Sequence, residues 1–348
     1  THCCEVRAVA WHPLVQFPAI IPRRREQPAR CCYTAGMQIL TVTLNPTIDR
    51  VIEVPGLQIG QHAKGTLRWI MPAGKAINVS RTLATLGVPN TAVGFVGSET
   101  LGMFERAGHE LGIATRFTPI AGRTRENITL IDPVGRTETH IRDVGPEVSP
   151  DEHAALAATL ADCLEPESIV VFTGSLPRGI TPEDFGELID RCGECGARVV
   201  VDSSGEALRI AARRRLWLLK VNAEEFSELI GRPVREVGEI MTAARQLQPR
   251  PEHVVVTLGA AGAVSLAPEG VHAASISGPT TQVVSTVGCG DAFLGGYLAG
   301  TLRGDAAEAL WLATSVATAS AAYEMPARFE MSRVREIQRQ GRVSRGEN

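Results

Sequence analysis

The stretch STVGCGDAFLGG, residues 285–296, combines residue types and spacing that could do chemistry. Gly288 and Gly290 flank Cys289 and precede Asp291, and apolar residues at helical spacing follow. Glycine permits a close backbone approach that a side chain would block. A turn at these glycines that opens a helix would leave unpaired N–H groups, and the helix dipole would add partial positive charge. The stretch therefore predicts an anion hole made by the backbone of Gly288, Cys289 and Gly290.

Asp291 is the residue of this stretch that could move a proton. Its place at a helix N-terminus predicts a depressed carboxyl pKa and hence a weak base. A loose phosphoryl-transfer transition state needs little prior activation of the nucleophile. The pattern fits a carboxylate that accepts a proton from an attacking hydroxyl during phosphoryl transfer. The alternative is an ordinary first-turn carboxylate beside a tightened loop.

Two other phosphate-binding motifs are excluded. The dinucleotide fingerprint requires a third glycine where Phe293 stands. Gly74 and Lys75 resemble the end of a P-loop, but Trp69 occupies the position of its first glycine. The sequence therefore favours neither a dinucleotide-binding dehydrogenase nor a P-loop enzyme.

A second candidate stretch is PAGKAINVSRTLATLG, residues 72–87. Gly74 is expected to open a helix, with Lys75 near its start and Asn78 one turn later. A lysine at the positive end of a helix is locally unfavourable, so a bound anion there would compensate it. A solvated lysine is the alternative and is the more common situation for this residue type.

Four apolar runs indicate the elements that must position these residues: 168–175, 197–204, 216–222 and 253–259. Each is nearly continuous in β-branched or aliphatic residues, and helical patterns separate them, which is typical of a parallel sheet buried on both faces. Each run ends in small or polar residues. Because ligands bind at the carboxyl ends of such strands, these endings are expected to line one crevice.

Two segments interrupt this pattern. Residues 48–72 and 125–144 alternate polar and apolar residues around turn signals. We expect them to form a small antiparallel sheet that covers the crevice as a lid. The outer face of this lid is a candidate homodimer surface.

Composition limits the class of protein. The chain has 348 residues, 44% hydrophobic and 21% charged, and a formal charge of −3. These values indicate a globular protein and argue against a nucleic-acid partner held by a basic surface. No run approaches the ~18–20 apolar residues needed to span a bilayer. We therefore expect a cytoplasmic location and no membrane partner.

Residues 1–36 are rich in Pro, Arg and Cys, show no periodicity, and are expected to be a disordered extension. Their arginine run follows the apolar patch, the reverse of the order in a signal peptide. The globular sequence is expected to cover 37–330, followed by a C-terminal tail at 331–348. Cys192 and Cys195 form a single CxxC pair, for which two free thiols are favoured over a zinc site.

Seven motifs between residue 38 and about residue 325 resemble the PfkB/ribokinase family, in the same order, and most closely its phosphosugar branch. They are TLNPTIDRV, PAGKAINVSR, GRTRENITL, GSLPRG, VDSSGEAL, KVNAEEF and VVSTVGCGDAFLGG. The resemblance implies a three-layer αβα sandwich with a mostly parallel central sheet and the small lid.

The resemblance also implies roles for individual residues. Asp291 corresponds to the catalytic base, and Gly288, Cys289 and Gly290 to the anion hole. The positions similar to the family's acceptor-binding residues are Asp49, Gly74, Lys75, Asn78, Arg125, Asn127 and Ser175. The positions similar to its nucleotide region are Asn222, Glu225, Thr257, Gly259 and Gly262.

Some of these positions have competing explanations. Arg125 could be a lid surface charge, although neighbouring Arg123 favours an anion clamp. Asn222 and Glu225 also fit a capping box, and both roles are compatible, with Glu225 reaching a metal through water. Cys289 stands where the family usually has alanine. At a helix N-terminus its thiol is expected to have a lowered pKa and to react with alkylating agents, with ATP protecting it.

The implied function is ATP-dependent phosphorylation of a ketohexose phosphate with Mg²⁺. Fructose 1-phosphate is the expected acceptor, fructose 1,6-bisphosphate the product, and tagatose 6-phosphate and fructose 6-phosphate the alternatives. A silent sugar-phosphate or nucleotide sensor on the same scaffold is the alternative of a different class. A sensor needs no proton acceptor, so the presence of Asp291 argues against it.

Overall fold

The computed structural model describes residues 37–276, 282–340 and 342–345. All of the described residues belong to one compact unit. The expected N-terminal extension lies outside the described residues. Within the described ranges, none of the helices has the length and apolar character that crossing a membrane requires.

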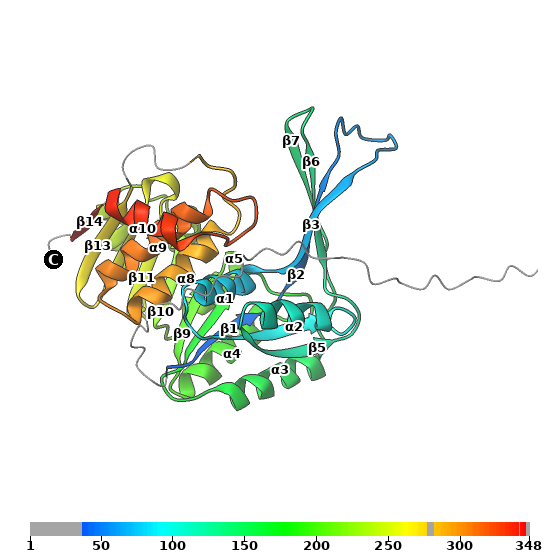
Figure 1. Cartoon of the computed structure of the whole chain (residues 1–348). Coiled ribbons are helices and arrows are strands. Elements are labelled where there is room, and N and C mark those ends of the chain that lie inside the picture. The colour runs from blue at the N-terminus through cyan, green and yellow to red at the C-terminus, as the bar shows by residue number, and fades with distance from the viewer. Residues whose placement is uncertain (1–36, 277–281, 341, 346–348) are drawn as a thin grey trace, which may run out of the picture. The chain divides into compact units, whose positions relative to one another are not determined.

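A large, mostly parallel sheet forms the centre of this unit (Figure 1). The pairings from β11 to β5 in spatial order are all parallel, whereas β12, β13 and β14 join by antiparallel pairings. The spatial order is β14 (Arg342–Arg345), β13 (Gly270–Ser275), β12 (Ala263–Ala267), β11 (His253–Thr257), β10 (Leu218–Asn222), β9 (Arg198–Asp202), β8 (Ile169–Thr173), β1 (Ile39–Thr43), β4 (Thr91–Gly97) and β5 (Ala114–Ile120).

Helices cover both faces of this sheet, which makes the three layers expected from the sequence. One face carries α3 (Pro150–Cys163), α4 (Pro182–Glu194), α5 (Gly205–Ala211), α6 (Ala223–Ile230) and α7 (Val237–Arg245). The other face carries α1 (Lys75–Thr85), α8 (Cys289–Thr301), α9 (Ala306–Ser320) and α10 (Met331–Gln340). Helix α2 (Leu101–Glu110) packs beside α1 and β4, and the 3₁₀ helix η1 (Gly259–Ala261) follows β11.

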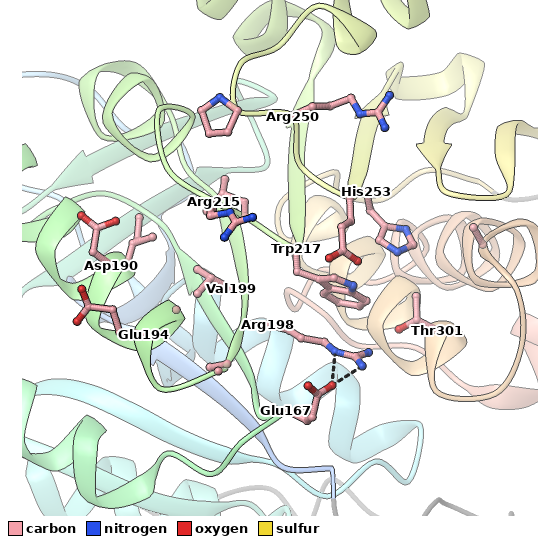
Figure 2. A pocket seen from close by; sticks show the side chains of 18 of the residues that line it. Glu167, Asp190, Glu194, Arg198, Val199, Arg215, Trp217, Arg250, His253 and Thr301 are labelled. Carbon is pink, nitrogen blue, oxygen red and sulfur yellow. Dashed lines mark hydrogen bonds and ion pairs between the residues drawn. The ribbon is translucent and has the colours of Figure 1, made fainter.

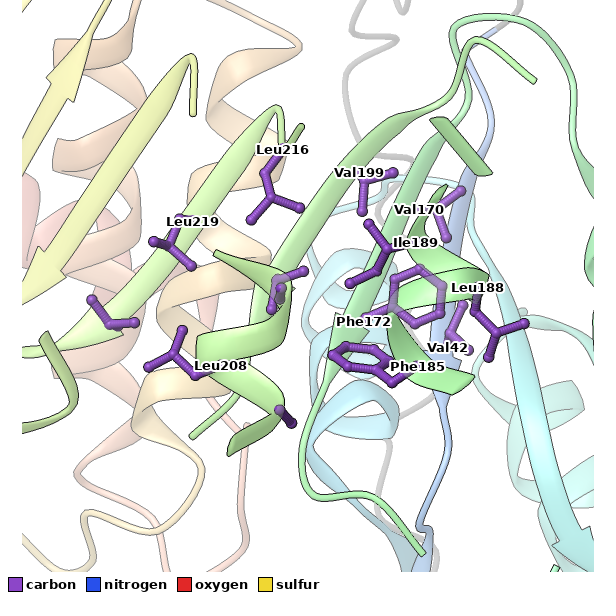
Figure 3. Close-up of a cluster of buried hydrophobic side chains, with 14 of the residues drawn as sticks. Val42, Val170, Phe172, Phe185, Leu188, Ile189, Val199, Leu208, Leu216 and Leu219 are labelled. Carbon is purple, nitrogen blue, oxygen red and sulfur yellow. The ribbon is translucent and has the colours of Figure 1, made fainter. Parts of the chain in front are cut away.

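The alternation of side chains along each strand explains why both layers form. In β8, Val170 and Phe172 point into the core shared with α4, where Phe172 meets Phe185 edge to face (Figure 3). Ile169 and Val171 point to the other face and pack with α1 and α8. Fully apolar strands of this kind are stable only when both faces are covered.

The lid is a separate sheet that projects from the large one, with the order β3-β2-β6-β7 (Figure 1). Its strands are β2 (Thr47–Glu53), β3 (Thr66–Ala73), β6 (Glu126–Asp132) and β7 (Thr137–Arg142). The two hairpins β2-β3 and β6-β7 are antiparallel, as expected, and β2 and β6 join them by a parallel pairing. Because both of these strands run outward from the core, they can meet only in parallel.

The C-terminal region differs from the expected tail. Residues 331–340 form α10, whose Val334 and Ile337 are buried against the second core, and β14 extends the large sheet beside β13. Two apolar residues three positions apart are enough to dock one face of a short helix. The helix was not expected because its sequence is otherwise strongly polar.

Candidate active site

The site lies where the central strands end. Ser175, Asp202, Asn222 and Thr257 follow or close β8, β9, β10 and β11. Asn222 pairs in register with Thr257, and the backbone N–H of Gly174 donates to the carbonyl of Asp202 (3.1 Å). The polar strand endings expected from the sequence therefore lie side by side at this edge of the sheet, the edge at which ligands bind in parallel sheets of this kind.

Helix α8 begins at this edge with a glycine that no other residue could replace without strain. Gly288 is the N-cap and has φ 76°, and a Cβ there would lie 2.7 Å from Cβ of Pro326. The N–H of Cys289 donates to the carbonyl of Thr286 (3.2 Å), so this amide is already engaged. Among the described residues, no acceptor is found for the N–H groups of Gly288, Gly290 and Asp291. Of the three amides expected to form the anion hole, those of Gly288 and Gly290 are therefore available to an anion and that of Cys289 is not.

Asp291 is buried at the start of α8, with 5% of its surface exposed. Its Oδ2 accepts a hydrogen bond from Nδ2 of Asn78 (2.8 Å). Burial raises the pKa of Asp291 to about 6, and the negative charge of Asp202 adds to the rise, while Asn78 and two lysines oppose it. The expectation of a depressed pKa is wrong, because burial outweighs the helix N-terminus. A carboxylate with this pKa is a better base than the sequence predicted.

Two lysines converge on a buried carboxylate beside Asp291. Lys220 Nζ lies 2.7 Å from Oδ2 of Asp202, and Lys75 Nζ lies 3.6 Å from its Oδ1. Burial opposes ionisation of Asp202, but the two ammonium groups hold its pKa below the ordinary value. Asp202 in turn raises the pKa of Lys75, with further contributions from Asp291 and Glu225. The cluster keeps Lys75 cationic and pairs Lys220 with Asp202 next to the free amides.

Asp202 and Lys220 were not identified as site residues from the sequence. One signal was present, since Lys220 interrupts an otherwise apolar run that had to be a buried strand. A buried lysine requires a partner. The sequence did not show which carboxylate would supply it.

Two lid residues for which the resemblance implies an acceptor-binding role lie next to each other. Asp49 on β2 and Asn127 on β6 are register partners, and Nδ2 of Asn127 donates to Oδ1 of Asp49 (3.1 Å). Burial raises the pKa of Asp49. Arg125, just before β6, donates to the carbonyls of Pro46 and Asn45, each at 3.1 Å.

Arg123 does not join Arg125 in an anion clamp. Its guanidinium pairs with Asp143 at 3.2 Å. Burial lowers the pKa of Arg125 from its usual high value. Arg125 is therefore the lid cation that faces the loop between β1 and β2.

Gly74 and Ser175 border this loop. Gly74 has φ 130°, and a Cβ would approach Cα of Pro46 and Cγ2 of Thr43 to 3.3 Å, so the start of α1 lies directly against the loop. Asn45, a position not identified from the sequence, donates through Nδ2 to Oγ of Ser175 (3.1 Å) and to the carbonyl of Leu176 (3.2 Å). Asparagine commonly bridges two loops in this way, but nothing in the sequence pairs these two.

The expected nucleotide residues lie along the neighbouring strand ends, and no hydrogen bond joins them to Asp291. Asn222 and Glu225 form the capping box of α6, with Glu225 N–H donating to Asn222 Oδ1 (2.8 Å) and Asn222 N–H donating to Glu225 Oε2 (2.9 Å). Thr257 Oγ1 donates to the carbonyl of Val221 (3.5 Å). Gly259 begins η1, and a Cβ on it would meet nothing within 4 Å. Gly262 follows η1 with φ 100°.

The expectation for Cys289 is wrong. Burial, together with the charge of Asp291, raises the pKa of its thiol to about 11. A thiol with this pKa carries almost no thiolate at neutral pH and is a poor target for alkylation. Cys192 and Cys195 are free thiols, as expected.

A cavity of about 1210 Å³ lies at the opposite edge of the sheet, where β9, β10 and β11 begin (Figure 2). Arg198 hydrogen-bonds to Glu167 and lies over the ring of Trp217, 5.6 Å from its centroid. None of the residues that line it belongs to the predicted site. Since free arginines and free carboxylates both face it, the cavity has no clear preference for an anion.

Comparison with known proteins agrees with this arrangement. Residues 43–328 match the profile of the pfkB family carbohydrate kinases. A 1-phosphofructokinase of Haemophilus influenzae is 34% identical over 284 residues, which cover 80% of this chain and 89% of that protein. A 1-phosphofructokinase of Escherichia coli is 36% identical over 282 residues, with the same two shares.

Solved structures show the same fold. Phosphofructokinase-2 from Escherichia coli, crystallised with potassium, matches with a TM-score of 0.81 and 25% identity over 87% of this chain and 99% of that one. A ribokinase from Arabidopsis thaliana matches with a TM-score of 0.66 and 20% identity over 87% of this chain and 98% of that one, which supports the fold alone.

The three-layer sandwich with its β lid, and a carboxylate beside free amides, define a phosphotransferase of ribokinase-like fold that uses an alcohol group as acceptor. The chain belongs to the pfkB family of carbohydrate kinases.

Proposed function

We propose that the protein transfers the terminal phosphoryl group of ATP to a ketohexose phosphate, and that fructose 1-phosphate is its acceptor and fructose 1,6-bisphosphate its product. The observation that carries the proposal is the buried carboxylate of Asp291, with a pKa of about 6, beside the N–H groups of Gly288 and Gly290, which have no acceptor among the described residues. The names of the relatives support the substrate class, since both are 1-phosphofructokinases.

Proton transfer is the role proposed for Asp291. With a pKa of about 6, most Asp291 side chains are ionised at neutral pH and ready to accept the proton of the attacking hydroxyl. The N–H groups of Gly288 and Gly290 would donate to the phosphoryl oxygens as negative charge develops there. In-line attack then requires only that the acceptor hydroxyl be held in line with the terminal phosphate of ATP.

The cations of the site match a reaction between two phosphorylated substrates. Lys75 and Lys220 both pair with Asp202 and lie beside the anion hole. In Gly290, a Cβ would lie 3.2 Å from Nζ of Lys220, so the missing side chain lets this ammonium approach the amides. Arg125 on the lid is proposed to contact the acceptor's own phosphate, because a guanidinium binds phosphate oxygens with parallel hydrogen bonds.

The residues present also fit ATP and magnesium. Oδ1 of Asp202 is buried and, among the described residues, has no partner within hydrogen-bond distance, since Nζ of Lys75 is 3.6 Å away. This oxygen can therefore also face a metal-bound water. Glu225 has one carboxylate oxygen that its capping box does not use. Within the described residues, no group of three or more His, Cys, Asp or Glu side chains could hold a metal ion, so phosphate and water would supply most ligands. When bound, magnesium would neutralise charge on the terminal phosphates.

The proposal is tested by steady-state assays with ATP and three acceptors: fructose 1-phosphate, fructose 6-phosphate and tagatose 6-phosphate. We expect kcat/KM to be at least tenfold higher for fructose 1-phosphate than for the other two. A preference for either 6-phosphate would overturn the acceptor assignment and leave the kinase class intact. Binding of ATP and phosphosugar without any ADP production would favour a sensor.

The lid is proposed to form a homodimer interface. Leu67 of β3 and Ile141 of β7 are exposed by 45% and 51%, which is unusual for large apolar residues in a regular sheet. One solved relative, phosphofructokinase-2 from Escherichia coli, is described as tetrameric in an inhibited form. A lid interface would bury these side chains and cover the edge strand β7.

A further inference from the structure

Helix α1 presents a chain of hydrogen bonds that ends at Asp291. Asn78 and Arg81 are three positions apart and therefore lie on the same side of the helix. Nη1 of Arg81 donates to Oδ1 of Asn78 (3.2 Å), and Nδ2 of Asn78 donates to Oδ2 of Asp291 (2.8 Å). The amide of Asn78 thus lies between a guanidinium and a carboxylate.

An asparagine amide has a donating end and an accepting end, and its neighbours decide which way it faces. If the amide of Asn78 were turned over, its NH₂ would face the donors of Arg81 and its oxygen would face Asp291. Both contacts would be repulsive. Arg81 therefore fixes the orientation in which Asn78 donates to Asp291.

Arg81 is itself held in place. Its Nη2 donates to the carbonyl of Pro72 (3.1 Å), which belongs to lid strand β3. Among the described residues it has no carboxylate within ion-pair distance, and Asp49 supplies the opposing charge from further away. Burial lowers the pKa of Arg81 to about 10, so the side chain remains a cation at neutral pH.

The contacts of Asp291 show what this orientation does. Its Oδ2 accepts from Asn78, and among the described residues no hydrogen bond is found to its Oδ1. A carboxylate held through one oxygen cannot rotate freely, so the other oxygen keeps a constant direction.

We propose that Arg81 is a positioning residue: through the amide of Asn78 it holds Asp291 by Oδ2 and leaves Oδ1 to take the proton of the acceptor hydroxyl. The inference rests on the proposed function of Asp291 as the base. Arg81 touches neither substrate in this role, so its effect must pass through Asn78.

The first experiment replaces Arg81 by methionine, which keeps the aliphatic stem and removes the charge and the donors. We expect kcat to fall about 10–100-fold with KM for ATP and for the phosphosugar changed less than threefold, since only the base is affected. The apparent pKa of the kcat profile should rise by about one unit, because a cation and a well-oriented donor are both lost from the surroundings of Asp291. A loss of stability alone would not move this pKa.

A double-mutant cycle tests the route through Asn78. If Arg81 acts through this amide, Arg81→Met in the Asn78→Ala background should cause no further loss of kcat. Additive losses would overturn the inference. A large rise in KM for the phosphosugar with unchanged kcat would also overturn it, by making Arg81 a direct ligand of the acceptor.

Controls keep the result interpretable. Arg214→Met removes another partly buried arginine that donates to a backbone carbonyl (Ile210, 2.9 Å), and it should leave the kcat profile unchanged. If Arg81→Met does not fold, Arg81→Lys serves in the same cycle, because lysine keeps the charge but not the planar pair of donors.

Asp291→Asn is assayed in parallel. If it keeps the parent kcat, the proposed function fails; if it is inactive while the cycle is additive, only this inference fails.

Discussion

At Asp291, burial and the helix N-terminus act on the pKa in opposite directions. The N-terminus of α8 favours the ionised carboxyl, whereas burial to 5% exposure and the charge of Asp202 favour the protonated one. Burial has the larger effect, and the pKa rises to about 6. The residue therefore combines an ionised ground state at neutral pH with useful basicity.

Replacing Asp291 by asparagine should lower kcat by about 10²–10⁴-fold, the usual contribution of a positioned general base. Asparagine keeps the size of the side chain and can still contact Asn78, so the KM values should change little. The assay is ADP release with ATP and the preferred phosphosugar. Asp190→Asn, at an exposed carboxylate of α4, is the control and should keep the parent rate.

The raised pKa also makes a prediction about stability. Asp291 has a pKa of about 6 in the folded protein and an ordinary value of 3.8, so the folded state binds an extra proton between these values. The stabilising contribution is present below pH 3.8 and is lost as the pH rises through 6. The effect of Asp291→Asn on the free energy of unfolding should therefore depend on pH. It should be more stabilising at pH 8 than at pH 3.5, by about 2–3 kcal/mol. Urea unfolding at the two pH values measures this, and equal effects at both would contradict it.

At the scale of elements, the start of α8 depends on its N-cap glycine. Gly288→Ala would put a non-glycine residue at φ 76° and a Cβ 2.7 Å from Pro326. We expect a loss of about 1–3 kcal/mol in stability and a larger fall in kcat than stability explains, because the free amides would shift. Gly193→Ala in α4, where a Cβ would contact nothing within 4 Å, is the control and should lower neither stability nor kcat. Thermal unfolding and kcat together separate the two effects.

The elements themselves were largely predictable. Runs such as 168–175 and 253–259 are apolar on both faces, so they had to be central strands, and β8 and β11 are there. The parallel pairing of β2 with β6 was not predictable, because it joins two segments more than 70 positions apart whose patterns fit either direction. Helix α10 was also missed, since only Val334 and Ile337 anchor it.

Features of the site that depend on neighbouring residues in the chain could be predicted from the sequence. Features that depend on contacts between distant segments could not. The turn at Gly288 and the capping box of Asn222 follow from neighbouring residues, and both are present. The pKa of Asp291 and the Asp202–Lys220 pair depend on what the folded chain brings around them. A linear sequence gives no direct measure of burial.

At the scale of the whole molecule, the proposed lid dimer predicts a specific sensitivity. Ile141→Glu would put a charge on an exposed apolar position of β7 and should shift the protein from dimer to monomer. Val237→Glu, at an apolar position of α7 that is 38% exposed, is the control and should not. Sedimentation velocity across a range of protein concentrations measures the difference. A monomeric parent protein would contradict the proposal directly.

The proposed domain boundary predicts that residues 1–36 are dispensable. A chain that begins at Met37 should keep the kcat and thermal stability of the full chain, because β1 begins only at Ile39. The two chains are compared in the same assay. A marked loss of either property on truncation would show that the N-terminal residues contribute to the fold or the site.

The groups proposed to hold the sugar and the group proposed to take its proton belong to different parts of the structure. Asp49 and Asn127, which are proposed to hold the sugar, are register partners within the lid, whereas Asp291 belongs to a helix packed on the large sheet. Any tilt of the lid would carry both sugar ligands together toward or away from the base. With no sugar bound, a water molecule near Asp291 would have no lid ligand to align it with the terminal phosphate. Wasteful hydrolysis of ATP should therefore be slow until the acceptor arrives.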